Sequence, residues 1–141
     1  MQTTPASSFK YEVKEEHGEK FVVITKFIGS ETEVVIPDEI DGLPVTEIGE
    51  WAFFCCTGLT SITLPKGLET IGEMAFRNCT SLKSVTLPEG LKLIGEDVFA
   101  GCSGQLRAMF PEDYGTDYSN DPDVRAYQNS GFGEGINFKI R

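Results

Sequence analysis

Basic residues are scarce in this chain of 141 residues, which carries 12 Lys and Arg against 22 Asp and Glu. The formal charge of −10 should repel nucleic acid and anionic lipid headgroups, so neither is expected as a primary partner. No apolar run approaches the ~20 residues that a membrane helix needs, so no membrane insertion is expected. Residues 1–13 lack the basic segment and the apolar run of a signal peptide, which fits a cytoplasmic protein or a secreted one without its leader.

Residues that typically carry catalysis are also few. His17 is the only histidine, and it lies among carboxylates in a predicted turn, where a solvated side chain is expected. No serine or cysteine has a sequence context typical of an activated nucleophile. We therefore predict no catalytic residue, no metal site and no cofactor, and a protein that is not an enzyme.

An acidic segment, residues 112–123, has part of the ligand pattern of a calcium loop. Asp117, Ser119, Asp121 and Asp123 alternate as the early ligands of such a loop do. However, Pro122 stands where the loop needs glycine, and residue 128 is glutamine where a bidentate glutamate is needed. We interpret the segment as a solvated loop.

The sequence repeats itself with a step of 23 residues. Three units start at Ile48, Ile71 and Ile94, each with Ile-Gly-Glu. A repeat of 20–50 residues is typical of a solenoid, in which each unit leaves an apolar face that its neighbour covers. Three further columns recur at this step: phenylalanine at Phe53, Phe76 and Phe99, cysteine at Cys56, Cys79 and Cys102, and proline at Pro65, Pro88 and Pro111.

Two periodicities alternate within a unit. Val85 and Leu87 are two residues apart, which predicts a short strand with Ser84 and Thr86 facing outward. Ala75, Phe76 and Cys79 are related by steps of three and four, which predicts one face of a short helix. Each coil is therefore expected to run strand, turn, short helix.

The pattern I-G-x-x-A-F-x-x-C-x-x-L-x-x-I-x-L-P-x-x-L resembles the BspA-type leucine-rich repeat, a bacterial and protozoan subfamily. The resemblance is specific over residues 34–110. It implies an α/β leucine-rich-repeat solenoid with parallel strands on the concave face and short helices on the convex face. The third unit departs from the pattern, because Gln105, Ala108 and Phe110 fill its apolar columns, so a shifted strand is expected there.

Both ends of the solenoid should be covered. Two apolar-rich runs, Phe9–Val13 and Phe21–Phe27, flank a charged turn and predict a β-hairpin cap. Asp121-Pro122-Asp123 predicts the start of a C-terminal helix, and residues 136–140 alternate as a closing strand does. The chain is thus expected to be one domain, 1–141, and a complete folding unit. Its parts are a hairpin cap (9–28), an introductory coil (29–47), three repeats (48–110) and a C-terminal cap (111–141).

The cysteine column has three possible roles. Zinc sites show close pairs such as C-x-x-C, and no second pair exists here. Neighbouring coils lie about 4.8 Å apart, so disulfides between them are conceivable. The same column is also the predicted inward face, where thiols pack as small hydrophobes, and this interpretation is favoured. Cys55 points elsewhere and is predicted to be the free thiol.

The outward strand positions form the candidate binding face. Small hydroxyl residues also simply suit exposed strands, which is the competing explanation. Four strands at ~4.8 Å by three or four residues at ~3.3 Å give only roughly 200 Å² of flat face, against ~800 Å² per partner in a standard interface. Binding by this face alone is therefore expected to be weak. The candidate residues are Glu33, Val35, Ser61, Thr63, Ser84, Thr86, Arg107 and Met109.

The favoured interpretation is a monomeric, non-enzymatic interaction module that binds a protein or glycan through this face. The family resemblance implies a secreted or cell-surface location and a role in adhesion. Two alternatives remain. The first is a structural spacer of a larger surface protein, with no ligand of its own. The second is a hydrolase of surface polysaccharide, which would need a cleft with converging carboxylates.

Overall fold

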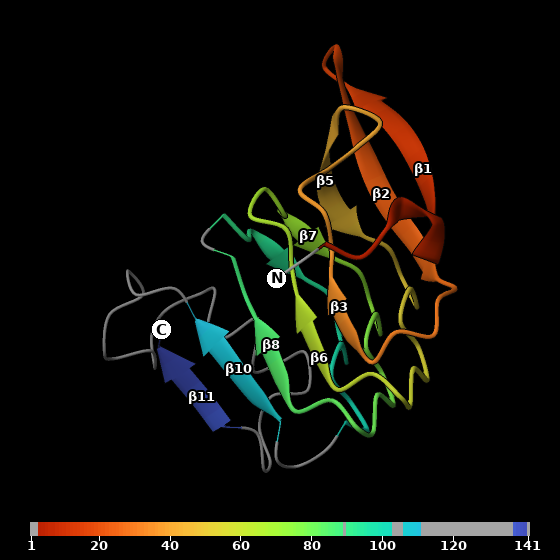
Figure 1. Ribbon diagram of the computed structural model, residues 1–141. Coiled ribbons are helices and arrows are strands. Elements are labelled where there is room, and N and C mark those ends of the chain that lie inside the picture. Colours follow the sequence, from red (N-terminus) through yellow and green to blue (C-terminus); the bar gives the residue numbers. More distant parts are fainter. Residues whose placement is uncertain (1–2, 89, 103–105, 111–136, 141) are drawn as a thin grey trace.

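The computed structural model describes residues 3–88, 90–102, 106–110 and 137–140, and these form a solenoid of about three turns. Each repeat contributes one short strand to each of two sheets (Figure 1). The first sheet has the order β1-β2-β5-β7-β9, with β4 paired to β5. Its strands are β1 (Phe9–Glu16), β2 (Glu19–Phe27), β4 (Glu39–Ile40), β5 (Leu43–Ile48), β7 (Thr70–Ile71) and β9 (Leu93–Ile94).

The second sheet has the order β11-β10-β8-β6-β3, and all its printed pairings are parallel. Figure 1 shows these five strands side by side in one layer. Their bounds are β3 (Glu33–Val35), β6 (Ser61–Thr63), β8 (Ser84–Thr86), β10 (Arg107–Phe110) and β11 (Asn137–Ile140). The strand predicted in each repeat is therefore confirmed as a member of this sheet. The second strand of each repeat, at Ile48, Ile71 and Ile94, was not predicted.

The shift expected in the third repeat is wrong. β10 pairs with β8 residue for residue, with Arg107 beside Ser84 and Met109 beside Thr86. The same register relates β8 to β6. The backbone hydrogen bonds of a parallel ladder hold the strand in register even though the side-chain columns have changed.

The phenylalanine column forms the axis of the core. Phe53, Phe76 and Phe99 are at most 1% exposed, and their rings stack in sequence, with centroids 4.9 Å and 5.6 Å apart. Phe27 of the hairpin continues the stack, at 5.3 Å from Phe53. The prediction that these three residues share one interior is confirmed.

The short helices predicted on the convex side are absent from the described repeats, where tight turns replace them. We call this surface the turn face (residues 49–56, 72–79 and 95–102). The one helical element among the described residues is a 3₁₀ turn, η1 (Ala6–Ser8). Residues in left-handed conformation, which an α-helix does not accommodate, recur twice per coil. One column holds Trp51, Met74 and Asp97, and the other holds Cys55, Asn78 and Gly101.

Backbone hydrogen bonds between coils explain why turns replace the helix. In the first repeat, alternate N–H groups donate to carbonyls of the next coil instead of to a carbonyl four residues back. The intervening N–H groups donate to carbonyls three residues back within their own coil. The bonds between coils are Trp51 to Glu73 (3.1 Å), Phe53 to Ala75 (2.7 Å) and Cys55 to Arg77 (2.8 Å), and those within the coil are Ala52 to Gly49 (3.3 Å), Phe54 to Trp51 (3.1 Å) and Cys56 to Phe53 (3.2 Å).

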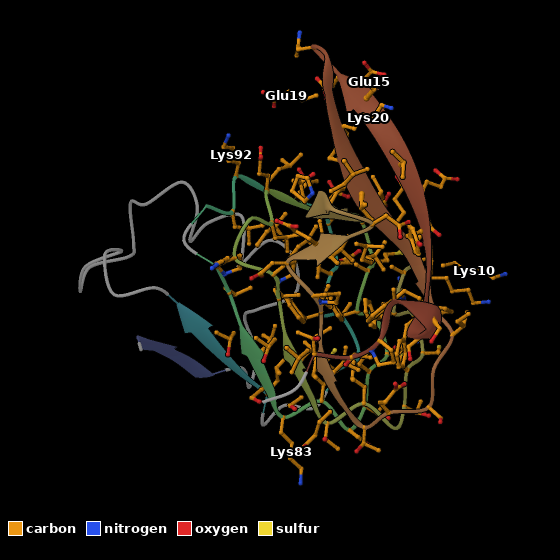
Figure 2. The ribbon with its side chains drawn as sticks, turned by 45° about the horizontal axis from the view of Figure 1, so that its top comes forward. Lys10, Glu15, Glu19, Lys20, Lys83 and Lys92 are labelled. Atoms are coloured by element: carbon orange, nitrogen blue, oxygen red, sulfur yellow. The ribbon has the colours of Figure 1, made fainter. Side chains whose placement is uncertain are left out.

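The N-terminal hairpin expected over residues 9–28 is present. β1 and β2 pair antiparallel and are joined by His17 and Gly18, whose φ angles of 54° and 80° suit a two-residue hairpin turn. Figure 2 shows Glu15, Glu19 and Lys20 at the tip of this hairpin, away from the body of the solenoid. β2 also pairs in parallel with β5, so the hairpin is continuous with the first sheet.

At the other end, β11 lies parallel to β10 and accounts for the predicted closing strand. The predicted C-terminal helix starting at Asp121 and the acidic segment 112–123 lie outside the described residues. No helix among the described residues has the length and apolarity needed to cross a bilayer.

Candidate functional site

The outward positions of the second sheet form two rows, because the parallel strands are in register. Glu33, Ser61, Ser84 and Arg107 occupy one row, and Val35, Thr63, Thr86 and Met109 occupy the other. We call these eight residues the hydroxyl stripe. The residues between the rows, Val34, Ile62 and Val85, are at most 1% exposed and point into the core. The rows therefore lie on the outer surface along β3, β6 and β8.

The residues of the hydroxyl stripe differ in solvent exposure. Glu33 is exposed, whereas Val35 and the four hydroxyl residues of β6 and β8 are partly buried. Arg107 and Met109 take their places from the backbone register of β10. β11 extends the rows with Asn137 and Lys139, two positions that the sequence did not assign to the stripe. The alternating pattern around these two residues was visible in the sequence. The register in which their strand pairs with β10 was not.

A shallow depression of about 440 Å³ lies at one end of the stripe. Val35, Thr63 and Thr86 form part of its wall, together with Thr3, Asp38 and Lys66. Sequence reasoning missed the last three residues. A signal existed for two of them, since Asp38 and Lys66 each follow the proline that ends a strand. The stripe is therefore less flat than the sequence implied, because the loops after the strands raise one rim.

Two contacts connect Asp38 and Lys66 at this rim. Asp38 Oδ1 accepts a hydrogen bond of 3.0 Å from the Lys66 backbone N–H, and the Lys66 ammonium lies 3.9 Å from Asp38 Oδ2. Both side chains are at least half exposed, so the ion pair itself adds little stability. The rim thus offers a ligand both a carboxylate and an ammonium group.

The N-terminal segment covers the free edge of β3. The Val35 N–H donates to Thr4 Oγ1 at 2.9 Å, and the Thr4 N–H donates to the Val35 carbonyl at 2.8 Å. These two bonds satisfy backbone groups that an edge strand otherwise leaves unpaired. They also hold Thr3 beside the depression, so the residues before the hairpin help to shape the candidate site.

The cysteine column lies along the turn face and its thiols interact with each other. All four cysteines are free, Cys55 is exposed and Cys79 is buried. The Cys79 thiol donates to the Phe53 carbonyl at 3.1 Å, and the Cys102 thiol donates to the Phe76 carbonyl at 3.1 Å. Hydrogen bonds with the Cys102 and Cys56 thiols, together with burial, raise the pKa of Cys79, so it stays a neutral thiol at physiological pH.

The remaining sequence candidates show no converging set of ligands or catalytic groups. His17 is an exposed hairpin residue whose Nε2 lies 3.7 Å from Glu16 Oε1. Over the described ranges, no three His, Cys, Asp or Glu side chains converge so as to hold a metal ion. The hydroxyl stripe and its depression form the candidate site.

Comparisons with known proteins give one family. The sequence profile described as "BspA type Leucine rich repeat region (6 copies)" matches residues 29–117. No curated protein sequence matches the chain. A leucine rich repeat protein of T. pallidum has a similar structure, with a TM-score of 0.60 and 27% identity over 80% of this chain and 66% of that one. A leucine rich cell surface protein of Faecalibacterium prausnitzii A2-165 gives a TM-score of 0.62 and 30% identity, and the match covers 77% of this chain but only 30% of that protein.

Proposed function

Because this chain belongs to the BspA-type leucine-rich repeat family, we propose that it is a non-enzymatic interaction module that binds a protein or a glycan along the hydroxyl stripe. The observation that carries the proposal is the register of the second sheet, which lines up the outward side chains of β3, β6 and β8 in two rows. Parallel rows of hydroxyls next to a depression present hydrogen-bond donors and acceptors to an elongated ligand.

The stripe is small, and this sets the strength of binding. With the ~4.8 Å strand spacing, its area remains well below the ~800 Å² per partner of a standard interface. The depression adds contact area through Thr3, Asp38 and Lys66. A single copy is therefore proposed to bind weakly, and tight attachment would come from several copies acting together.

A cell-surface or secreted location forms part of the proposal. It is supported by the F. prausnitzii protein, which is described as a leucine rich cell surface protein. That protein is much longer than this chain, which covers 30% of its length. The same fact favours the second candidate function, a structural spacer within a larger surface protein.

Charged substitutions in the stripe separate the two functions. The double variant Thr63→Arg, Ser84→Arg places two long side chains where a ligand would lie, and Thr57→Arg is a control at an exposed position just after the turn face. Each protein is used to pull down binding partners from host extracellular matrix and from bacterial lysate. An interaction module loses its partner in the double variant and keeps it in the control. A spacer gives the same result for wild type and both variants.

A further inference from the structure

An exposed aromatic pair lies on the turn face, away from the hydroxyl stripe. Trp51 is 45% exposed and Phe54 is 41% exposed, and their rings contact edge to face with centroids 4.7 Å apart. Trp and Phe are enriched at interaction surfaces relative to the rest of a protein surface. In the next coil the same two columns hold Met74 and Arg77, whose guanidinium Nη1 lies 3.5 Å from Met74 Sδ.

The conformation of Trp51 shows that folding does not favour tryptophan here. Its φ of 61° lies in the left-handed region, which is unfavourable for a bulky side chain. The third coil places Asp97 in the same column, a residue type that tolerates this conformation well. A tryptophan at a strained, exposed position is therefore better explained by contact with a ligand than by stability.

Trp51 is linked through its backbone to a row of carboxylates that lies on the neighbouring part of the surface. Glu50, Glu73 and Glu96 recur once per coil and line a depression of about 400 Å³ together with Glu47. Trp51 follows Glu50 directly, and its N–H donates to the Glu73 carbonyl. None of the described residues that line this depression is basic, and no ion pair within the described part of the chain involves its four carboxylates.

We propose that Trp51, Phe54 and the carboxylates of Glu50, Glu73 and Glu96 form a second binding surface, which takes an arginine- or lysine-rich segment of a partner protein. An aromatic face attracts a cation, and neighbouring carboxylates accept hydrogen bonds from a guanidinium or an ammonium group. Charge complementarity decides the occupant, because a second copy of a chain with a net charge of −10 would be repelled. Arg77 occupies the position of Phe54 in the next coil, and its positive charge repels a cation. The bound cation is therefore expected on the side of the glutamates.

The chain carries a convenient reporter for this surface. Trp51 is its single tryptophan, so a ligand that covers the ring changes the only tryptophan emission. A peptide of eight arginines is titrated into the protein near physiological ionic strength, and binding is followed by Trp51 emission and by anisotropy of the labelled peptide. We expect saturable binding with a change in emission, and a glutamate peptide of the same length gives none.

Matched variants separate the proposed surface from general attraction to an acidic protein. Glu73→Gln and Phe54→Ala are each expected to weaken binding by about threefold to tenfold. Glu15→Gln removes the same charge at the hairpin tip (Figure 2) and is expected to change binding less than about twofold, as long-range screening implies. The stripe variant Thr63→Arg, Ser84→Arg should bind the arginine peptide at least as well as Thr57→Arg does. This expectation holds whether or not the stripe variant loses a partner in the pull-down experiment.

Several results would overturn the proposal. Equal weakening by Glu15→Gln and Glu73→Gln would mean non-specific attraction, and an unchanged Trp51 emission would mean that the peptide lies elsewhere. Self-association that is lost in Phe54→Ala would assign the surface to a second copy, and an emission change with a neutral oligosaccharide would assign it to a glycan. Circular dichroism of each variant verifies folding, which substitutions of these exposed or partly buried surface residues should preserve.

Discussion

The rings of Phe53 and Phe76 stack with centroids 4.9 Å apart and an angle of 18° between their planes. The two residues are 23 positions apart in the sequence, one full coil, and each is fully buried. Their contact shows that the coils bury their apolar columns against each other along the solenoid axis. Every coil depends on its neighbour for this packing.

Phe76 has a neighbour in the stack on both sides, so truncating it should be costly. Phe76→Ala is expected to lower the free energy of unfolding by about 3–5 kcal/mol. The exposed Phe54→Ala serves as the control, and its effect should stay below about 1 kcal/mol. Denaturant titration measures both. A melting temperature of Phe76→Ala within a degree or two of wild type would contradict the packing described.

Gly72 lies where the backbones of two coils approach closely. A Cβ at this position would be 2.6 Å from the Glu50 nitrogen and 2.8 Å from the Gly49 carbonyl carbon, both backbone atoms that cannot rotate away. Gly72→Ala is therefore expected to destabilise the protein by about 1–3 kcal/mol. A Cβ at Gly67 would meet nothing within 4 Å, so Gly67→Ala should be neutral or slightly stabilising. Equal urea midpoints for the two variants would contradict the close approach of the coils.

Asp97 lies in a column of left-handed residues, so two substitutions at this position should affect the free energy of unfolding differently. Asp97 is exposed and has a φ of 55°. Asp97→Val should cost about 1–2 kcal/mol, because a β-branched side chain clashes in this conformation. Asp97→Gly should change the free energy of unfolding by less than about 0.5 kcal/mol or raise it. Urea unfolding distinguishes them, and equal losses would mean that the turn does not require this conformation.

Glu31 should respond to removal of one hydroxyl. The Ser8 hydroxyl donates to Glu31 Oε2 at 2.7 Å, and this bond, followed by backbone hydrogen bonds, lowers the pKa of Glu31 below its ordinary value. A lowered pKa in the folded state contributes stability at pH above the unfolded value, and this contribution is lost as the pH falls through the folded value. Ser8→Ala should therefore raise the pKa of Glu31 in an NMR titration. The difference in free energy of unfolding between Ser8→Ala and wild type should be present at pH 7 and shrink in acid. A difference that does not change with pH would contradict the contribution from Glu31 ionisation.

The cysteines should differ in reactivity according to their exposure. Cys55 is exposed, whereas the Cys79 thiol is buried and its pKa is raised, so it holds little thiolate. Brief treatment with iodoacetamide is expected to label Cys55 in the folded protein and Cys79 only after unfolding. Mass spectrometry of the peptides gives the order, and the Cys55→Ser variant confirms the assignment. Labelling of Cys79 as fast as Cys55 would contradict its position in the interior.

The candidate surfaces could be derived from the sequence only in part. Alternation in Ser84-Val85-Thr86, repeated at a step of 23, was enough to predict the rows of the hydroxyl stripe, since the step fixes the register of parallel strands. Asp38 and Lys66 each follow the proline that ends a strand, but their contact depends on the path of two loops, which no local pattern encodes. The exposure of Trp51 and Phe54 was missed because an aromatic residue in a repeat is ordinarily assigned to the core.

The sequence by itself determined the central column of the core. A column that recurs once per coil stacks on itself, so the 23-residue step alone placed Phe53, Phe76 and Phe99 in one interior. The backbone of the turn face was decided only by the tertiary structure. Steps of three and four bring Ala75, Phe76 and Cys79 to one side in a helix and also in these turns, so the side-chain pattern does not distinguish the two. The turns form instead of a helix because the N–H groups of alternate residues bond to carbonyls of the next coil. Those acceptors come within reach only once the next coil is packed in place.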